Sequence, residues 1–263
     1  MKATAFEQMG IYLLKGDDWL LKQRIAGKAV ATALSALIEL VNSKTGLTTL
    51  ELNNVAEDII ADHGCLPTFK NYRGFPSACC ISVNKHLVHG IPDNYRLQEG
   101  DLVSFDLGAT YDGAIGDSAV TVIYGEPKNQ EHVRLIRSTE NALAEAIKSI
   151  AIDKRLGVIG ETIYKIGKSS GYGVVTDLGG HHLDWNTPHS DPFVSNRDNA
   201  DNGMRIQRGM SLCIEPLLCI GMPRVKRLSD GWTIETEGLS AHFEHTLYVH
   251  EDRVEIMTDR SLP

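Results

Sequence analysis

Apolar positions in the first part of the chain recur at the spacing of two helices. Over about residues 17–41 the pattern follows a helical period, and Gly46 ends it. Thr48 followed three residues later by Glu51 is typical of a capping box, so a second helix is predicted from there to Gly64. The apolar residues that define the first helix are Leu20, Ile25, Leu34, Leu37, Ile38 and Val41.

Residues 102–120, LVSFDLGATYDGAIGDSAV, predict the β-hairpin around which the rest of the chain is organised. Two apolar runs flank an Asp112-Gly113 pair, which favours a tight turn. Folding the arms together places Asp106 and Asp117 within about two residues of being opposite. Two carboxylates so placed in a half-buried sheet repel each other and are costly to desolvate, so they require a shared proton or a shared cation. The alternative is that one of them is a solvated residue at the sheet edge.

The order of elements repeats after the hairpin. A strand is predicted at 80–83 in the first part, and helical patterns at about 131–150 and 156–171 precede strand-like segments near 172–175, 211–215, 239–249 and 253–257. This repetition predicts one domain over 1–263, made of two α+β halves, roughly 1–128 and 129–263, whose sheets pack side by side. Residues 178–208, rich in His, Asp, Asn and Gly, are expected to form a long functional loop.

Composition narrows the class of protein. Of the 263 residues, 42% are hydrophobic and 23% charged, which is typical of a soluble globular protein, and the net charge of −8 argues against non-specific binding to nucleic acid or anionic membranes. We expect no signal peptide at the N-terminus and no segment of membrane-span length. Five cysteines without CxxC spacing favour reduced thiols in a cytoplasmic protein rather than a structural zinc site.

Two further acids complete a candidate metal site. Glu215 ends one strand-like run and Glu244 lies within the next, so each half supplies two acids on buried-looking strands. Four carboxylates in one cleft could hardly remain ionised without about two divalent cations. A fifth ligand should be a neutral imidazole, and the spacing does not choose among His181, His182 and His189.

The donor set restricts the metal and the chemistry. Oxygen ligands with one nitrogen and no thiolate suit Mn²⁺, Fe²⁺ or Co²⁺, with Zn²⁺ fitting on affinity grounds. Two such ions can hold a hydroxide at neutral pH, the usual nucleophile for hydrolysing an amide or a phosphate ester. No Ser or Cys stands in a recognisable arrangement with a base, so the sequence offers no alternative nucleophile.

Short motifs along the chain, in a consistent order, carry a resemblance to a known family. They are Thr48-Thr-Leu-Glu-Leu-Asn53, Asn71-Tyr-Arg-Gly-Phe-Pro76, Cys80-Ile-Ser-Val-Asn84, His89-Gly-Ile-Pro92, Gly100-Asp-Leu-Val-Ser-Phe-Asp106, Gly116-Asp117, Ile214-Glu-Pro216, Asp230-Gly-Trp232 and Ser240-Ala-His-Phe-Glu-His245. Together they resemble the type I methionine aminopeptidases over nearly the whole chain. The resemblance implies an α+β, pita-bread fold: two pseudo-symmetric halves around a central, largely antiparallel curved sheet.

The resemblance also implies roles for individual residues. It assigns His89 to hydrogen-bonding the substrate near the scissile amide and makes Glu215 a proton carrier as well as a ligand. The implied metal ligands are Asp106, Asp117, Glu215, Glu244 and one histidine. The residues that fall where the family lines its methionine pocket are Tyr72, Phe75, Cys80 and Trp232.

One stretch departs from the family's pattern. The family usually has Gly-His-Gly-Ile-Gly-Arg before a short His-Glu-x-Pro segment, whereas residues 180–192 read GHHLDWNTPHSDP, without the later glycines and the arginine and with one residue more. Aligning on the final proline makes His189 the metal ligand. The same alignment makes His181 a structural residue and Asn196 a polar residue that faces the substrate.

The leading hypothesis is a cytoplasmic, monomeric aminopeptidase that uses two divalent ions to activate water and removes the initiator methionine from peptides and nascent chains, with the ribosome as a candidate partner. One alternative is a proline-directed relative, although such relatives generally carry a large extra N-terminal domain. The other is a metal-free binding protein that kept the fold and lost activity. Retention of all four acids and of His89 argues against that last hypothesis.

Overall fold

Two helices and a long hairpin form the first half of the protein. The structure, a computed structural model, describes residues 14–261; residues 1–13, where we expect no signal peptide, lie outside the described part. The predicted capping box is present, because Thr48 accepts a hydrogen bond from the Glu51 amide and donates its own amide to the Glu51 carboxylate at 2.8 Å. The elements of this half are α2 (Asp17–Ser43), α3 (Thr49–Asp62), β1 (Leu66–Pro67), the 3₁₀ turn η1 (Tyr72–Gly74), β2 (Cys79–Val83), β3 (His86–Val88), β4 (Leu102–Tyr111) and β5 (Ala114–Ile123).

The predicted hairpin is confirmed. Strands β4 and β5 pair antiparallel along their whole length, and Asp112 and Gly113 form the turn with φ of 46° and 87°. Positive φ at both turn positions is what a tight hairpin turn requires. Asp117 lies opposite Gly108, two residues from Asp106 on β4. Because side chains alternate along a strand, the two aspartates share one face of the hairpin and sit diagonally.

The second half repeats the order of helices before strands. Helices α4 (Gln130–Ser149) and α5 (Gly157–Ser169) are followed by strands, and the strand-like segment at 239–249 is two strands interrupted at Phe243-Glu244. The remaining elements are β6 (Gly173–Val174), β7 (Gly179–Asp184), β8 (Thr187–Ser195), β9 (Ser211–Ile214), β10 (Leu217–Cys219), β11 (Val225–Arg227), β12 (Ile234–Thr236), β13 (Ser240–His242), β14 (His245–Val249) and β15 (Val254–Ile256).

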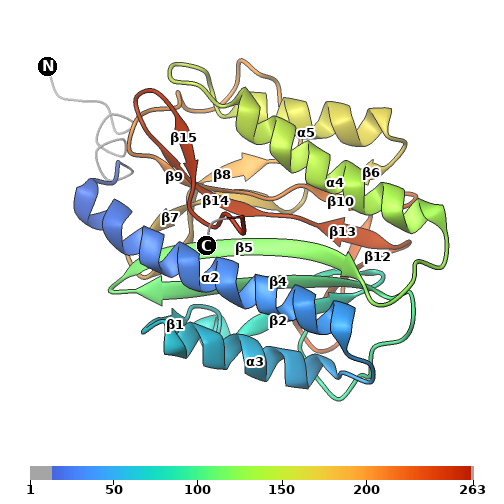
Figure 1. The fold of residues 1–263 in the computed structure, drawn as a ribbon. Helices are drawn as coiled ribbons and strands as arrows, with labels where there is room; N and C mark the ends of the chain where they lie inside the picture. The colour runs from blue at the N-terminus through green and yellow to red at the C-terminus, as the bar shows by residue number, and fades with distance from the viewer. Residues whose placement is uncertain (1–13, 262–263) are drawn as a thin grey trace, which may run out of the picture.

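The two halves meet where β5 lies beside the break between β13 and β14 (Figure 1). The amide of Glu244 donates to the carbonyl of Ala119 at 3.0 Å, and the hydroxyl of Thr246 bonds both the amide and the carbonyl of Asp117. These bonds extend the sheet across the middle of the molecule. Helices α2 and α4 pack on this central layer, α2 against β4 and β5, and α4 against β10 and β13.

The expectation of a long loop at residues 178–208 is wrong. Most of this stretch is a hairpin of β7 and β8, and β7 also pairs with β9. The turn between the two strands contains Asn186 at φ 54°, a conformation that Asn tolerates better than most residues. Polar side chains misled the prediction because β8 alternates between buried and exposed positions. The buried strand, β7, carries its histidines towards the interior of the protein.

Helix α2 is more apolar than the sequence expectation allowed. It is long and apolar enough to cross a membrane by length and composition alone, although half of its most apolar window is buried in the protein. Ala and Gly residues stand between the large apolar residues of α2, so its apolar segment is longer than the large apolar residues alone indicate. Val30, Leu34 and Leu37 have no exposed surface and belong to the main core. Packing against β4 and β5 therefore accounts for the hydrophobicity of this helix.

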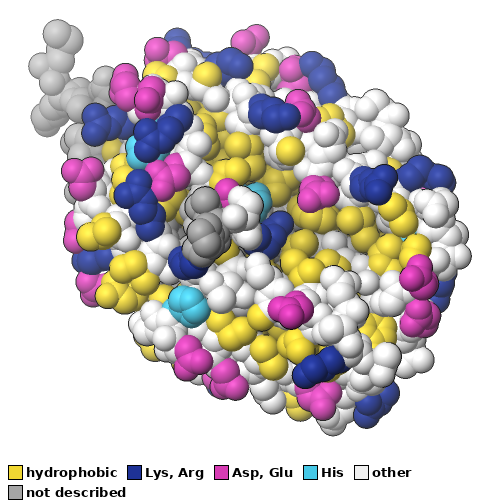
Figure 2. Space-filling model, viewed as in Figure 1, with side chains coloured by type: hydrophobic (Ala, Val, Ile, Leu, Met, Phe, Trp, Pro, Cys, Tyr) yellow, Lys and Arg dark blue, Asp and Glu magenta, His cyan; other side chains and the backbone are white. Residues whose placement is uncertain are grey.

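The surface bears mixed charge. Figure 2 shows Lys and Arg side chains interspersed with Asp and Glu on the face that carries α2 and α4. Among residues 14–261, the side chains visible on that face show no large patch of a single sign that would attract a polyanion non-specifically.

Gly27 lets α2 approach the rest of the molecule, and its replacement should be costly. A Cβ at Gly27 would lie 2.0 Å from the carbonyl oxygen of Met257, whereas a Cβ at Gly16 would meet nothing within 4 Å. We expect Gly27→Ala to lower the free energy of unfolding by about 1–3 kcal/mol through overpacking. Gly16→Ala, at the N-cap of α2, meets no atom and should cost less, at most about 1 kcal/mol through the weaker N-cap preference of alanine. Equal urea midpoints for the two variants would contradict this account of the α2 contact.

Candidate metal centre and adjoining pocket

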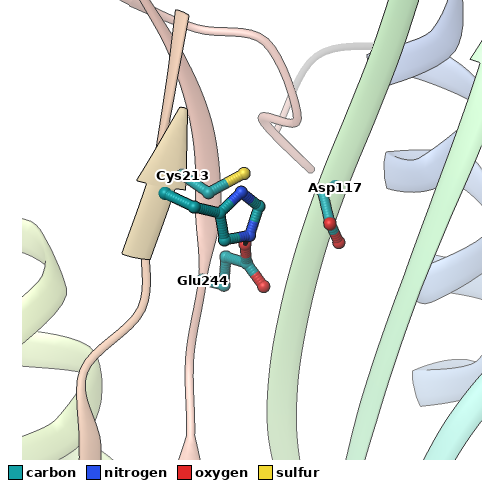
Figure 3. Close-up of side chains that lie close together, drawn as sticks. Asp117, Cys213 and Glu244 are labelled. Atoms are coloured by element: carbon teal, nitrogen blue, oxygen red, sulfur yellow. Dashed lines mark ion pairs between the residues drawn. The ribbon is translucent and has the colours of Figure 1, made fainter. Parts of the chain in front are cut away.

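Four acidic side chains from both halves converge at the junction of the halves. Asp106 lies on β4, Asp117 on β5, Glu215 directly after β9, and Glu244 in the break between β13 and β14. Their burial is high, with Asp117 1% and Glu244 3% exposed. Figure 3 shows Asp117 on β5 across from Glu244 and Cys213 of the other half, and the donor atoms of these residues lie within 4.8 Å of one another. The structure thus brings together the two acids that the sequence analysis selected in each half.

These acids have no basic partner among the described residues: no Lys or Arg of residues 14–261 forms an ion pair with any of them. One buried oxygen of each of Asp106, Asp117 and Glu244 lacks a hydrogen-bond partner. Burial raises the pKa of Asp106 to about 7 and that of Glu215 to about 8. Burial and repulsion by neighbouring carboxylates raise the pKa values of Asp117 and Glu244 as well. Such a cluster is stable only when it shares protons or binds cations.

His181 supplies an imidazole to this cluster. It lies on β7 opposite Cys213 of β9, and its Nε2 is 3.8 Å from one oxygen each of Glu215 and Glu244. Its Nδ1 is 3.3 Å from the backbone oxygen of His182. Burial lowers the pKa of His181 to about 3, so the ring is neutral. A proton on Nδ1 then leaves the Nε2 lone pair directed at the carboxylates, the usual arrangement of a metal-binding histidine.

His189 does not lie in this cluster. It is on β8, with its ring centroid 4.6 Å from that of His181 and 5.5 Å from that of Tyr72. The alignment that favoured His189 as the ligand treated residues 181–189 as a loop. In the hairpin, His181 stands beside β9 and His189 is one strand further out. His181, rather than His189, therefore lies beside the glutamates, where the sequence analysis expected His189.

Two donors near the acids were missed by the sequence analysis. His242 has its Nε2 3.5 Å from Glu215 Oε2, and the Cys213 thiol belongs to a group with donor atoms within 4.8 Å of one another. The donor atoms form two overlapping groups that share Glu244: Asp117, His181, Cys213 and Glu244; and Glu215, His242 and Glu244. A signal was available, because each missed residue stands two positions before one of the glutamates, the spacing of one strand face.

An apolar pocket opens beside the acids. It is part of a cavity of about 620 Å³ that also reaches Asp106, Asp117, Glu215 and Glu244. All the residues that the resemblance assigned to the methionine pocket line this cavity: Tyr72, Phe75, Cys80 and Trp232. The rings of Phe75 and Trp232 meet edge to face at 5.2 Å. Phe69, which the sequence analysis did not select, packs with Phe75 and Cys80.

His89 stands at the junction of pocket and acids. It follows β3 with φ of 58°, an uncommon conformation for a residue other than glycine, and it lines the cavity 6.4 Å from Trp232. Burial lowers the pKa of His89 to about 4, so its ring is neutral and offers one N–H donor and one acceptor. This is the form that the predicted contact with a substrate amide requires.

Asn196 does not face the cavity. Its side chain is fully buried, and Nδ2 donates to the backbone oxygen of Glu215 at 2.9 Å and to that of Val175 at 3.3 Å. The expected contact with substrate is therefore not supported. Asn196 instead fixes the backbone that carries Glu215.

Comparisons with known proteins agree with this geometry. The profile of metallopeptidase family M24 matches residues 22–251. The methionine aminopeptidase of Clostridium perfringens is 39% identical over 248 residues, which cover 94% of this chain and 98% of the relative. The crystal structure of the methionine aminopeptidase of Thermotoga maritima superposes with a TM-score of 0.90 at 37% identity, over 94% of this chain and 98% of that one.

More distant structures share the fold only. The prolidase of Pyrococcus furiosus has a TM-score of 0.77 at 21% identity, and the match covers 95% of this chain but 66% of the prolidase. A proline-directed activity is therefore not favoured. The chain has the pita-bread fold, and it belongs to metallopeptidase family M24 and, within it, to the methionine aminopeptidases.

Proposed function

We propose that this protein is a metal-dependent aminopeptidase that removes N-terminal methionine from peptides and nascent chains. The observation that carries the proposal is the position of four acids, three buried and Glu215 13% exposed, without Lys or Arg partners among the described residues, directly beside an apolar pocket that ends at His89. The acids, where the peptide bond would be hydrolysed, are thus held at a fixed distance from the pocket for the substrate's first side chain. Removal of a single N-terminal residue requires such a fixed distance.

Divalent cations fit the cluster. Buried oxygens without partners and raised carboxyl pKa values are both relieved when cations replace protons. We assign Asp106, Asp117, Glu215, Glu244 and His181 to holding two such ions. Oxygen donors with an imidazole suit Mn²⁺, Fe²⁺, Co²⁺ or Zn²⁺. When bound, the ions polarise the scissile carbonyl and make water nucleophilic at neutral pH.

The chain's own residues orient the substrate and move the proton. Tyr72, Phe75, Cys80 and Trp232 provide an apolar, polarisable wall that suits an unbranched thioether side chain. Neutral His89 donates a hydrogen bond near the scissile amide. The Glu215 carboxylate takes a proton from the attacking water and passes it to the leaving nitrogen.

We propose that the protein works in the cytoplasm. All five cysteines are free and buried, which suits a reducing compartment. A monomeric state, and contact with the ribosome during synthesis, stay predictions from the resemblance.

A panel of peptides that differ only in the first residue tests the function. After chelation we expect no cleavage, and added Mn²⁺ or Co²⁺ should restore turnover of a Met-Ala peptide. Norleucine should follow methionine closely, because one missing or extra methylene changes binding by only about 1–3 kcal/mol, whereas alanine should be cleaved far more slowly. Full turnover in stripped protein, or equal rates for alanine and methionine, would refute the assignment.

Two histidine variants test the ligand assignment. We expect His181→Ala to weaken Mn²⁺ binding by at least about tenfold in a calorimetric titration, because it removes the nitrogen directed at Glu215 and Glu244. His189→Ala should leave Mn²⁺ binding intact and raise KM, because that ring lies on the pocket side, against Tyr72. If only His189→Ala lost metal binding, His189 would be the metal ligand, as the alignment on the final proline predicts.

The pH dependence of apoprotein stability tests the carboxylate cluster. The folded protein keeps the Asp106 proton up to about pH 7, whereas the unfolded chain loses it near the ordinary value of 3.8. Stability from this group is therefore present at low pH and is lost as pH rises through that window.

With chelator present, Asp106→Asn and wild type should therefore unfold at similar urea concentrations near pH 4. The variant should be more stable by about 1–4 kcal/mol near pH 8, because it carries no charge to bury. Saturating Mn²⁺ should reverse the order, since only wild type binds the ions fully. A difference that is independent of pH would contradict the raised pKa.

A further inference from the structure

His242 is a buried histidine that none of the roles described above uses. It ends β13, two residues before Glu244, and its side chain is 2% exposed. Its backbone is fixed on both sides, because the amide donates to the Thr121 hydroxyl at 2.8 Å and the carbonyl accepts from that hydroxyl at 2.9 Å. The backbone that carries the ring is therefore fixed by β5, the strand that also carries Asp117.

The ring faces the same two glutamates as His181, but it is near their other carboxylate oxygens. Its Nε2 lies 3.5 Å from Glu215 Oε2 and 3.8 Å from Glu244 Oε2. His181 has its Nε2 3.8 Å from the other oxygen, Oε1, of each glutamate. Each glutamate thus presents one oxygen to each imidazole.

Neither nitrogen of the His242 ring has a hydrogen-bond partner. Leaving a polar group unpaired in the interior of a protein is costly, and such groups generally have a partner. The distances from Nε2 to the glutamate oxygens do not make a good hydrogen bond. They are close to the separation of two ligands of one ion, because donor atoms each about 2.0–2.2 Å from a metal lie about 3–3.5 Å apart.

We propose that His242 is a second imidazole ligand of the metal centre, binding an ion together with the Oε2 atoms of Glu215 and Glu244, whereas His181 faces their Oε1 atoms. This inference rests on the proposed two-ion centre and adds a donor that the sequence analysis and the resemblance did not assign. Each of the two ions then has one imidazole among its ligands. The sequence analysis predicted only one imidazole for both ions together. An extra nitrogen donor shifts the preference of that ion towards metals that favour imidazole, such as Zn²⁺ and Fe²⁺, over Mg²⁺ or Ca²⁺.

His242→Gln tests the proposal, because glutamine keeps a polar side chain and removes the imidazole. We expect one of the two Mn²⁺ ions seen by calorimetric titration to bind at least tenfold more weakly, with the other changed less than threefold. His245→Gln is the matched control, since His245 stands three residues away and its Nδ1 is 2.9 Å from the hydroxyl of Thr258, outside the cluster. That control should bind both ions as wild type does.

Proton NMR of the Co²⁺-loaded protein separates a ligand from a residue that only orients Glu215. Each Co²⁺-bound imidazole gives a strongly shifted, exchangeable ring N–H resonance. Wild type should show two such resonances and His242→Gln one. Two shifted resonances in His242→Gln, or unchanged binding of both ions, would overturn the proposal.

Two further variants keep the outcome decisive. If chelator-treated His242→Gln melts well below His245→Gln, His242→Asn replaces it and must give the same loss of one ion and one resonance. His181→Ala should remove the other ion and the other resonance. If His181→Ala also binds both ions normally, the proposed metal centre fails as a whole, whereas loss in His181→Ala alone refutes only the role of His242.

Discussion

The burial of four carboxylates at the contact of β5 with the β13–β14 break is the constraint on which the rest of the structure depends. An isolated ionised carboxylate is costly to remove from water, and four together add mutual repulsion. The protein holds them there with backbone bonds between Ala119 and Glu244 and with the bonds of the Thr246 hydroxyl to Asp117. These bonds join the two halves, so the same contacts that complete the sheet also bring the acids together. Metal binding and the association of the halves are therefore expected to be coupled.

The pocket depends on the same frame. Cys80 of β2 pairs in register with Asp106 of β4, so one end of the pocket is built on the strand next to a carboxylate. His89 directly follows β3. That strand pairs with β12, which begins two residues after Trp232. Cys80 lies on a strand, whereas Tyr72, Phe75, His89 and Trp232 lie in short segments directly before or after strands, so the strands fix where the pocket wall stands relative to the acids. Such a site keeps a fixed distance between the apolar pocket and the acids, which is the basis of selecting a terminal residue.

Local patterns made much of this structure predictable. The Asp112-Gly113 turn determined the hairpin register and with it the shared face of Asp106 and Asp117, because the side-chain period of a strand is two. The capping box at Thr48 identified the start of α3. Strand-like runs singled out Glu215 and Glu244 as well. The resemblance then supplied the pocket residues, which are too far apart in the chain for any local pattern to connect.

The rest could not be predicted because it depends on pairing between distant strands. Polar residues at 178–208 are typical of a loop, and only the contact of β7 with β9 shows that His181, rather than His189, reaches the glutamates. The hairpin also explains why Asn196 turns inward to the Glu215 carbonyl. His242 is different, because it stands two residues before Glu244, a spacing that places both side chains on one face of an extended strand and that the sequence alone contains.

A crystal structure of the Mn²⁺-loaded protein, with anomalous difference maps at the manganese edge, tests the central claim most directly. The account predicts two anomalous peaks among Asp106, Asp117, Glu215 and Glu244, with His181 in contact with one of them. Acids that remain protonated and bonded to one another at saturating Mn²⁺, with no anomalous peak between them, would contradict it.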